Sequence, residues 1–181
     1  AQSTTSIRRL LRDPAGYLWR YALHWSAPVL EQQPLALPRP AFGELVHELI
    51  GRAISVLEPV PGIARADETD IRSAVDAAVE EVARTWPLAR AVPPPLLWRH
   101  TLDEAARMTF RGLTVDAHRL ADTQSWTELA FGEEEGAAAP PAPWDSASPV
   151  TIPGTDLRFR GRIDRVDLRP DGSAARITDY K

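Results

Sequence analysis

Residues 161–181 read GRIDRVDLRPDGSAARITDYK, and this stretch predicts a β-hairpin. Residue types that favour strands lie on both sides of a proline- and glycine-containing turn at 170–173. The pair Asp171-Gly172 favours a type I′ turn, in which both central residues take a positive φ. With this pair at the centre of the turn, Asp164 lies directly opposite Asp179 on the neighbouring strand.

The two facing aspartates indicate a metal site. Carboxylates with Cβ atoms about 5 Å apart across a ladder repel each other and destabilise the sheet. A hard divalent cation removes this repulsion, because it takes carboxylate oxygens as ligands. Lys181 lies two residues beyond Asp179 and therefore projects from the same face. Two acids beside a lysine are the groups that metal-dependent phosphodiester hydrolysis requires.

The alternative interpretation is an ordinary amphipathic hairpin with charges on its surface. In such a hairpin the charged residues lie on the face opposite the aliphatic ones. Here Asp164 shares its face with Val166 and Leu168, which favours the catalytic interpretation. Asp167 points to the other face, and we expect it to have a structural role.

Composition limits the class of protein. At 181 residues the chain has the length of a single domain, and its hydrophobic (44%) and charged (25%) contents are those of a globular protein. The net charge of −4 argues against a dedicated nucleic-acid-binding module, although an enzyme needs only a local basic path. Cysteine is absent, so this chain holds no disulfide and no iron–sulfur cluster. No stretch resembles a signal peptide or a membrane span, and by default we expect a cytoplasmic protein.

The order of elements predicts an α/β fold in which the helices come first, as in α+β proteins. We expect N-terminal helices packed on a small, mixed and mostly antiparallel sheet. The expected helices cover residues 6–12, 14–24, 41–57, 70–86 and 96–120, and the strands begin at residue 126. Residues 132–149 are acidic and rich in proline, so we expect a mobile loop there.

Two further residues are candidates for the same site. His47 lies beside the apolar stripe of the 41–57 helix, and Gly43 one turn earlier would let a strand or a substrate backbone come close. A packed or surface histidine is the alternative. Glu128, in the strand-like segment WTELAF, is either a further acid near the metal or a surface residue in a salt bridge.

Three motifs together resemble a known nuclease family. FGELVHELI, GRIDRVDL and ITDYK occur in that order and resemble the RecB-type branch of the PD-(D/E)XK nuclease superfamily. The opening stretch STTSIRRLLRDPAGYLWRYAL resembles the first helix of that branch. Relatives with an iron–sulfur cluster have a cysteine where Asp13 stands here, so the resemblance implies the version without the cluster.

The resemblance implies a restriction-endonuclease-like fold and assigns roles to residues. His47, Asp164 and Asp179 would bind one or two Mg²⁺ or Mn²⁺ ions, and Lys181 would be the catalytic lysine. Tyr180 fits the motif and would face away from the metal, into packing. Family members continue beyond the lysine with a further helix, so we expect residues 1–181 to be a single nuclease domain truncated at its C-terminus. We expect this fragment to bind metal but to be a weak nuclease or an inactive one.

The implied activity is a DNA exonuclease of recombination and repair, attached to or partnered with a helicase. A catalytically silent module that binds DNA ends or acts as a scaffold is the alternative, and a purely structural domain is a third. Ser6, Arg9 and Arg162 are candidate DNA contacts, with a solvated basic face as the alternative for the arginines. We expect the tryptophans to be mostly core residues, although base stacking by Trp19 or Trp25 is also conceivable.

Overall fold

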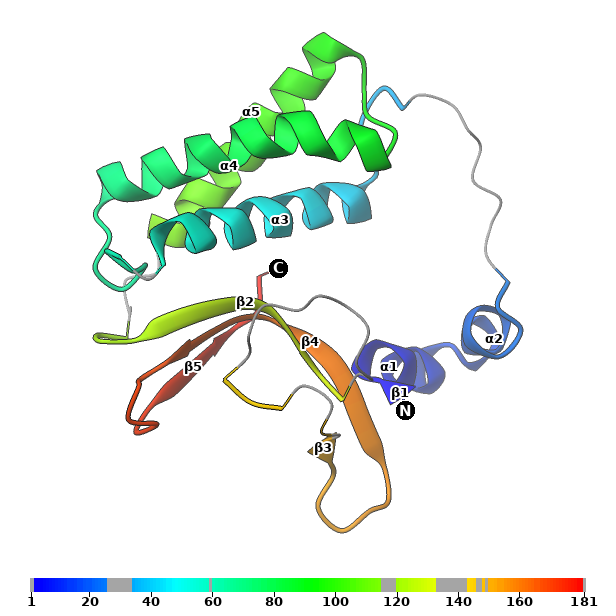
Figure 1. The fold of residues 1–181 in the computed structure, drawn as a ribbon. Helices are drawn as coiled ribbons and strands as arrows, with labels where there is room; N and C mark the ends of the chain where they lie inside the picture. Colours follow the sequence, from blue (N-terminus) through cyan, green and yellow to red (C-terminus); the bar gives the residue numbers. More distant parts are fainter. Residues whose placement is uncertain are drawn as a thin grey trace. The chain divides into compact units, whose positions relative to one another are not determined.

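The computed structural model describes residues 2–25, 34–58, 60–114, 120–132, 143–145, 148 and 150–180 (Figure 1). The chain divides into two compact units, and each is described by itself. Unit 1 combines Ala1–Glu31 with Leu129–Ile163, and unit 2 combines Gln32–Glu128 with Asp164–Lys181. Most of the loop expected at 132–149 lies outside the described residues.

Three helices form the main body of unit 2. They are α3 (Arg39–Leu57), α4 (Glu68–Ala89) and α5 (Pro95–Thr114), and they lie side by side in Figure 1. Each presents an apolar stripe with helical spacing to the other two. The fully buried side chains of this core include Leu45, Leu49, Ala53, Ile71, Val82, Ala105 and Leu113.

Several helix boundaries differ from those expected, and two of the differences are at the start of α4 and the end of α5. α4 begins three residues early, because Asp67 caps it and Asp70 is the third residue of a capping box rather than the cap itself. α5 ends at Thr114, whereas the sequence pattern predicted a helix to residue 120. Residues 115–119 lie outside the described part, and Leu120 is not helical.

The sheet is mixed and mostly antiparallel, as expected. Its strands are β1 (Gln2–Ser3), β2 (Gln124–Phe131), β3 (Val150–Thr151), β4 (Arg158–Leu168) and β5 (Ala175–Thr178). β4 is the central strand: β1 pairs with it in parallel, and β3 and β5 pair with it in antiparallel orientation. β2 lies on the other side of β4 from β1.

The register of the β4–β5 hairpin is the predicted one, although the turn is of a different kind. Val166 pairs with Ile177 and Arg165 pairs with Thr178, so Asp164 and Asp179 follow next along the two strands. Of the two turn residues expected at positive φ, only Gly172 has one, at 70°. Pro170 fixes its own φ near −65° and therefore favours a turn that begins one residue earlier, with Gly172 donating to the carbonyl of Arg169.

The N-terminal part of unit 1 is a helical segment with an exposed aromatic surface. It consists of α1 (Thr4–Arg12), α2 (Pro14–Tyr17) and a turn of π-helix, η1 (Leu18–Ala22), with Asp13 capping α2. The expectation that the tryptophans are mostly core residues holds for Trp86 and Trp98 and not for Trp19 and Trp25. Their rings stack on each other and remain 47% and 65% exposed, because no described element packs over them. Within the described part, no helix has the length and apolar character needed to cross a membrane.

A buried polar network supports the strands of unit 2. Arg165 and Asp167 are each only 1% exposed, and the Nε–H of Arg165 donates to Asp167 Oδ1 over 2.7 Å. The hydroxyl of Ser125 on β2 donates to the same oxygen, and Arg165 Nη1 reaches the hydroxyl of Tyr180 at 3.2 Å. Asp167 therefore belongs to the supporting structure, on the face of β4 away from Asp164.

The buried pair generates a stability prediction. Replacing Asp167 with alanine leaves the Arg165 guanidinium buried without its carboxylate, which costs about 3–5 kcal/mol. Chemical denaturation should therefore show a free energy of unfolding lower by about this amount for Asp167→Ala. Asp103→Ala, at an exposed position of α5, is the matched control and should change the free energy by less than about 0.5 kcal/mol. Equal values for the two variants would contradict a structural role for the pair.

Candidate metal centre

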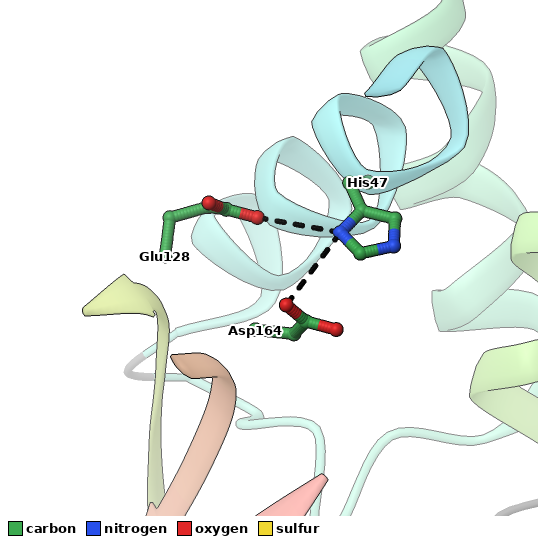
Figure 2. A group of neighbouring side chains, drawn as sticks. All are labelled: His47, Glu128 and Asp164. Atoms are coloured by element: carbon green, nitrogen blue, oxygen red, sulfur yellow. Dashed lines mark ion pairs between the residues drawn. The ribbon is translucent and has the colours of Figure 1, made fainter. Parts of the chain in front are cut away.

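Three side chains from three different elements of unit 2 meet at one point (Figure 2). His47 comes from α3, Glu128 from β2 and Asp164 from β4. The Nδ1 atom of His47 lies 3.6 Å from Glu128 Oε1 and 3.7 Å from Asp164 Oδ1. One ligand atom from each residue lies within 4.8 Å of the others. All three side chains are partly exposed, so ions and substrate can reach them.

The main chain of Tyr180 holds two of these groups in place. Its N–H donates to Asp164 Oδ2 over 2.8 Å, and its carbonyl oxygen lies 3.3 Å from His47 Nε2. The ring of Tyr180 packs against the helical core with its edge toward the imidazole. The side chain is packed, as expected, and its orientation away from the metal stays a prediction. Its main chain touches both His47 and Asp164.

The carbonyl contact determines how the imidazole is used. A carbonyl oxygen only accepts hydrogen bonds, so the bond to Tyr180 requires a proton on Nε2 of His47. Nδ1 then faces two carboxylates. A neutral ring would point its lone pair at these negative charges, which is unfavourable unless a cation or a proton lies between them. The carboxylate of Glu128 is the largest cause of a raised His47 pKa; partial burial opposes it, and Asp164 adds to it.

Glu128 is held by an unusual backbone. Its φ is 53°, in the left-handed region that residues other than glycine rarely adopt. Such a conformation in a strand costs on the order of 1–3 kcal/mol, and strain of this kind is concentrated at functional sites. The bend brings the carboxylate toward His47. The sequence pattern left two roles open for Glu128, an acid near the metal or a surface residue, and the structure places it beside His47.

Asp164 is also perturbed toward its protonated form. Partial burial is the largest cause of its raised pKa, and the nearby carboxylate of Asp179 raises it further. The N–H of Tyr180 and the charge of His47 act in the opposite direction without cancelling the increase. The two aspartates are therefore close enough to interact, as the hairpin register predicts.

The other residues predicted for the site are Asp179, Lys181 and the three candidate DNA contacts. Asp179 is exposed, and Lys181 lies outside the described residues. Ser6 is buried at 2% exposure, Arg9 pairs with Asp13 and Arg162 is exposed. The contacts of these last three with DNA stay predictions.

The space beside Gly43 is open. A Cβ atom at this position would meet no other atom within 4 Å, so no neighbouring strand requires the glycine. Gly51, later in α3, differs because a Cβ atom there would lie 3.4 Å from Thr127 Oγ1 on β2. An approach of substrate to Gly43 stays a prediction.

The donor set fits a divalent cation. One imidazole nitrogen and carboxylate oxygens suit Mn²⁺, and the acids suit Mg²⁺. In an octahedral complex with bonds of about 2.1 Å, neighbouring donors lie roughly 3 Å apart and opposite donors roughly 4.2 Å apart. The distances of 3.6 and 3.7 Å fall between these values. A divalent cation would offset the mutual repulsion of the carboxylates of Glu128, Asp164 and Asp179.

Comparison with known families supports this interpretation. A family model described as the PD-(D/E)XK nuclease superfamily matches residues 1–181, which is the whole chain. Comparison with curated proteins gave no match. Members of the matched family use divalent metal ions, in agreement with the donor set at His47, Glu128 and Asp164.

The raised pKa of His47 predicts how the stability of the metal-free protein depends on pH. The folded state holds the His47 proton more tightly than the unfolded state, so the resulting stabilisation is complete below about pH 6.5. It is lost as pH rises from there through the higher pKa of the folded state. Chemical denaturation at a series of pH values should show this loss in the parent and not in His47→Gln.

Metal binding should follow the opposite course. Affinity for Mn²⁺ should increase over the same pH window, because the ion and the proton compete for Nδ1. Identical pH profiles of stability for the parent and His47→Gln would contradict this assignment.

Proposed function

The chain belongs to the PD-(D/E)XK nuclease superfamily, and we propose that it is a metal-dependent deoxyribonuclease that hydrolyses phosphodiester bonds at DNA ends. The observation that carries this proposal is the convergence of His47, Glu128 and Asp164 from three elements. Family membership supports nuclease activity in general and DNA as substrate. Exonuclease action, and a place in recombination and repair, rest on the resemblance to the RecB-type branch.

We assign metal binding to four side chains. His47 contributes Nδ1, and Glu128, Asp164 and Asp179 contribute carboxylate oxygens. When bound, Mg²⁺ or Mn²⁺ supplies Lewis-acid polarisation of the scissile phosphate and lowers the pKa of a water nucleophile. The role of Tyr180 is indirect: its main chain keeps His47 and Asp164 oriented before substrate arrives, which reduces the reorganisation needed during the reaction.

Lys181 is assigned to the developing charge. Attack on a phosphodiester concentrates negative charge on the phosphoryl oxygens, and an ammonium group nearby stabilises that charge. An ammonium does not bind a divalent cation, so Lys181 acts on the substrate rather than on the metal. The RecB-type assignment and a helicase partner are also part of this proposal. Both rest on the resemblance of the sequence motifs to that branch.

The central test is metal-dependent loss of DNA. With Mn²⁺ the natural full-length protein, the parent in this test, should degrade linear DNA, and EDTA should stop the reaction. Asp164→Asn should lower the rate by about 100-fold or more, since even the loss of groups that orient a metal ligand costs 10- to 100-fold. Metal-free Asp164→Asn should unfold at the same or a slightly higher temperature, because the variant removes a repelled charge.

The controls separate metal binding from general damage. Glu128→Gln should weaken the stabilisation by Mn²⁺ in thermal unfolding, whereas Glu104→Gln, at an exposed position of α5, should leave it unchanged. Mn²⁺ binding without cleavage of DNA would instead favour a catalytically silent module that binds DNA ends. Equal thermal shifts with Mn²⁺ in the parent, Asp164→Asn and Glu128→Gln would overturn the metal site.

Lys181 gives a separate prediction. Lys181→Ala should lower kcat by roughly 100- to 1,000-fold, the cost of removing one group that stabilises a charged transition state. Its affinity for Mn²⁺, measured by calorimetry, should stay close to that of the parent. A loss of affinity as large as that in Asp179→Asn would show that the lysine holds the metal site together instead.

A further inference from the structure

The exposed tryptophans of unit 1 form a pair that the main chain holds in place. The rings of Trp19 and Trp25 stack with centroids 4.9 Å apart and an interplanar angle of 25°. The N–H of Trp25 donates to the carbonyl of Trp19 over 2.8 Å. This bond is made because His24, between them, has a φ of 51° and turns the chain back on itself. A left-handed histidine is strained, and strain at a surface position is typical of functional sites.

The segment that carries the pair is positively charged. Residues 2–25 contain four arginines and one aspartate, a net charge of +3 with histidine counted as neutral, whereas the whole chain carries −4. The arginines are all exposed, and they are Arg8, Arg9, Arg12 and Arg20. The aspartate, Asp13, is partly neutralised by Arg9 at 3.2 Å. A polyanion is therefore the ligand that this segment attracts.

We propose that Trp19 and Trp25 form a stacking surface for the unpaired bases of single-stranded DNA, with the exposed arginines of the same segment contacting its phosphates. The proposal rests on the proposed function, which makes DNA the substrate, and it narrows that substrate to a strand with unstacked bases. Flat indole faces accept any base, so binding needs little sequence preference.

The chemistry favours a single strand over the other possible occupants. The bases of a duplex are stacked on one another and cannot lie on an indole face, whereas those of a single strand can. A protein partner is the competing occupant, because several leucines of the same segment are also exposed: Leu10, Leu11, Leu18 and Leu23. Apolar protein docking would use those leucines as much as the tryptophans, and it would not require four exposed arginines.

The test measures binding without cleavage. A fluorescein-labelled oligothymidylate is titrated with the full chain in EDTA, and its anisotropy is followed. Trp25→Ala should raise the Kd by about 5- to 100-fold, the range for loss of one base–aromatic contact. Trp25→Phe keeps a ring and should retain most of the affinity. Leu11→Ala removes an apolar side chain that is 80% exposed, and it is the matched control that should bind like the parent.

Each outcome decides the question. No binding of the oligonucleotide by the parent, or an unchanged Kd for Trp25→Ala, would overturn the proposal. An equal loss for Leu11→Ala and Trp25→Ala would also overturn it, in favour of a general apolar docking surface. Circular dichroism verifies that the variants are folded. If Trp25→Ala is not folded, Trp19→Ala decides, because it removes the other ring of the pair and should raise the Kd in the same way.

The result of the oligonucleotide-binding test does not depend on the result of the cleavage test. The tryptophans are not among the metal ligands, and the binding assay contains no metal. Normal stacking without Mn²⁺-dependent cleavage would refute the nuclease while keeping the single-strand site. Mn²⁺-dependent cleavage with an unchanged Kd for Trp25→Ala would support the nuclease and refute the single-strand site.

Discussion

The pairing of β4 with β5 is the constraint on which the candidate site depends. Its register places Arg165 opposite Thr178, and the next positions along the two strands are Asp164 and Asp179. A shift by one residue would move Asp164 to the other face of the sheet, away from α3. The same register brings the main chain of Tyr180 alongside Asp164 and within reach of His47. One hairpin therefore orders two acids and a histidine from a distant helix.

The opposite face of the hairpin carries a buried polar network. Arg165 and Asp167 form a buried ion pair there. Ser125 on β2 donates a hydrogen bond to Asp167, and Arg165 donates one to the hydroxyl of Tyr180. A buried pair of this kind is a weak source of net stability, but breaking it is costly, and it discriminates against a shifted register. The two faces of β4 thus have different roles. The face with Arg165 and Asp167 specifies the strand pairing, and the face with Asp164 presents a carboxylate to a cation.

Much of this arrangement could be predicted from the sequence, because the determinants are local. The order of helices and strands follows from periodicity, and the register follows from the position of the turn between two strand-like segments. The kind of turn was mispredicted, since Pro170 outweighs the preference of Asp171-Gly172 for type I′. His47 could be proposed as a ligand from the motif, and the structure places its ring beside Asp164.

Other features depend on tertiary structure and leave no clear local signal. Glu128 reaches His47 only because its backbone takes a positive φ within a strand, which no propensity for glutamate indicates. Trp19 lies in the helix expected at 14–24 and Trp25 directly follows it, but the chain departs from the α-helix at η1 and turns at His24, and both rings are exposed. The position of Lys181 lies outside the described residues, so its role stays a prediction from the motif.

The most direct test of the central claim is the location of a bound ion. Crystals of the protein grown with Mn²⁺ should show an anomalous difference peak at about 2.1–2.3 Å from His47 Nδ1 and from carboxylate oxygens of Glu128 and Asp164. Absence of a peak at saturating Mn²⁺, or a peak bound by other residues, would contradict the assignment of these side chains as the metal centre.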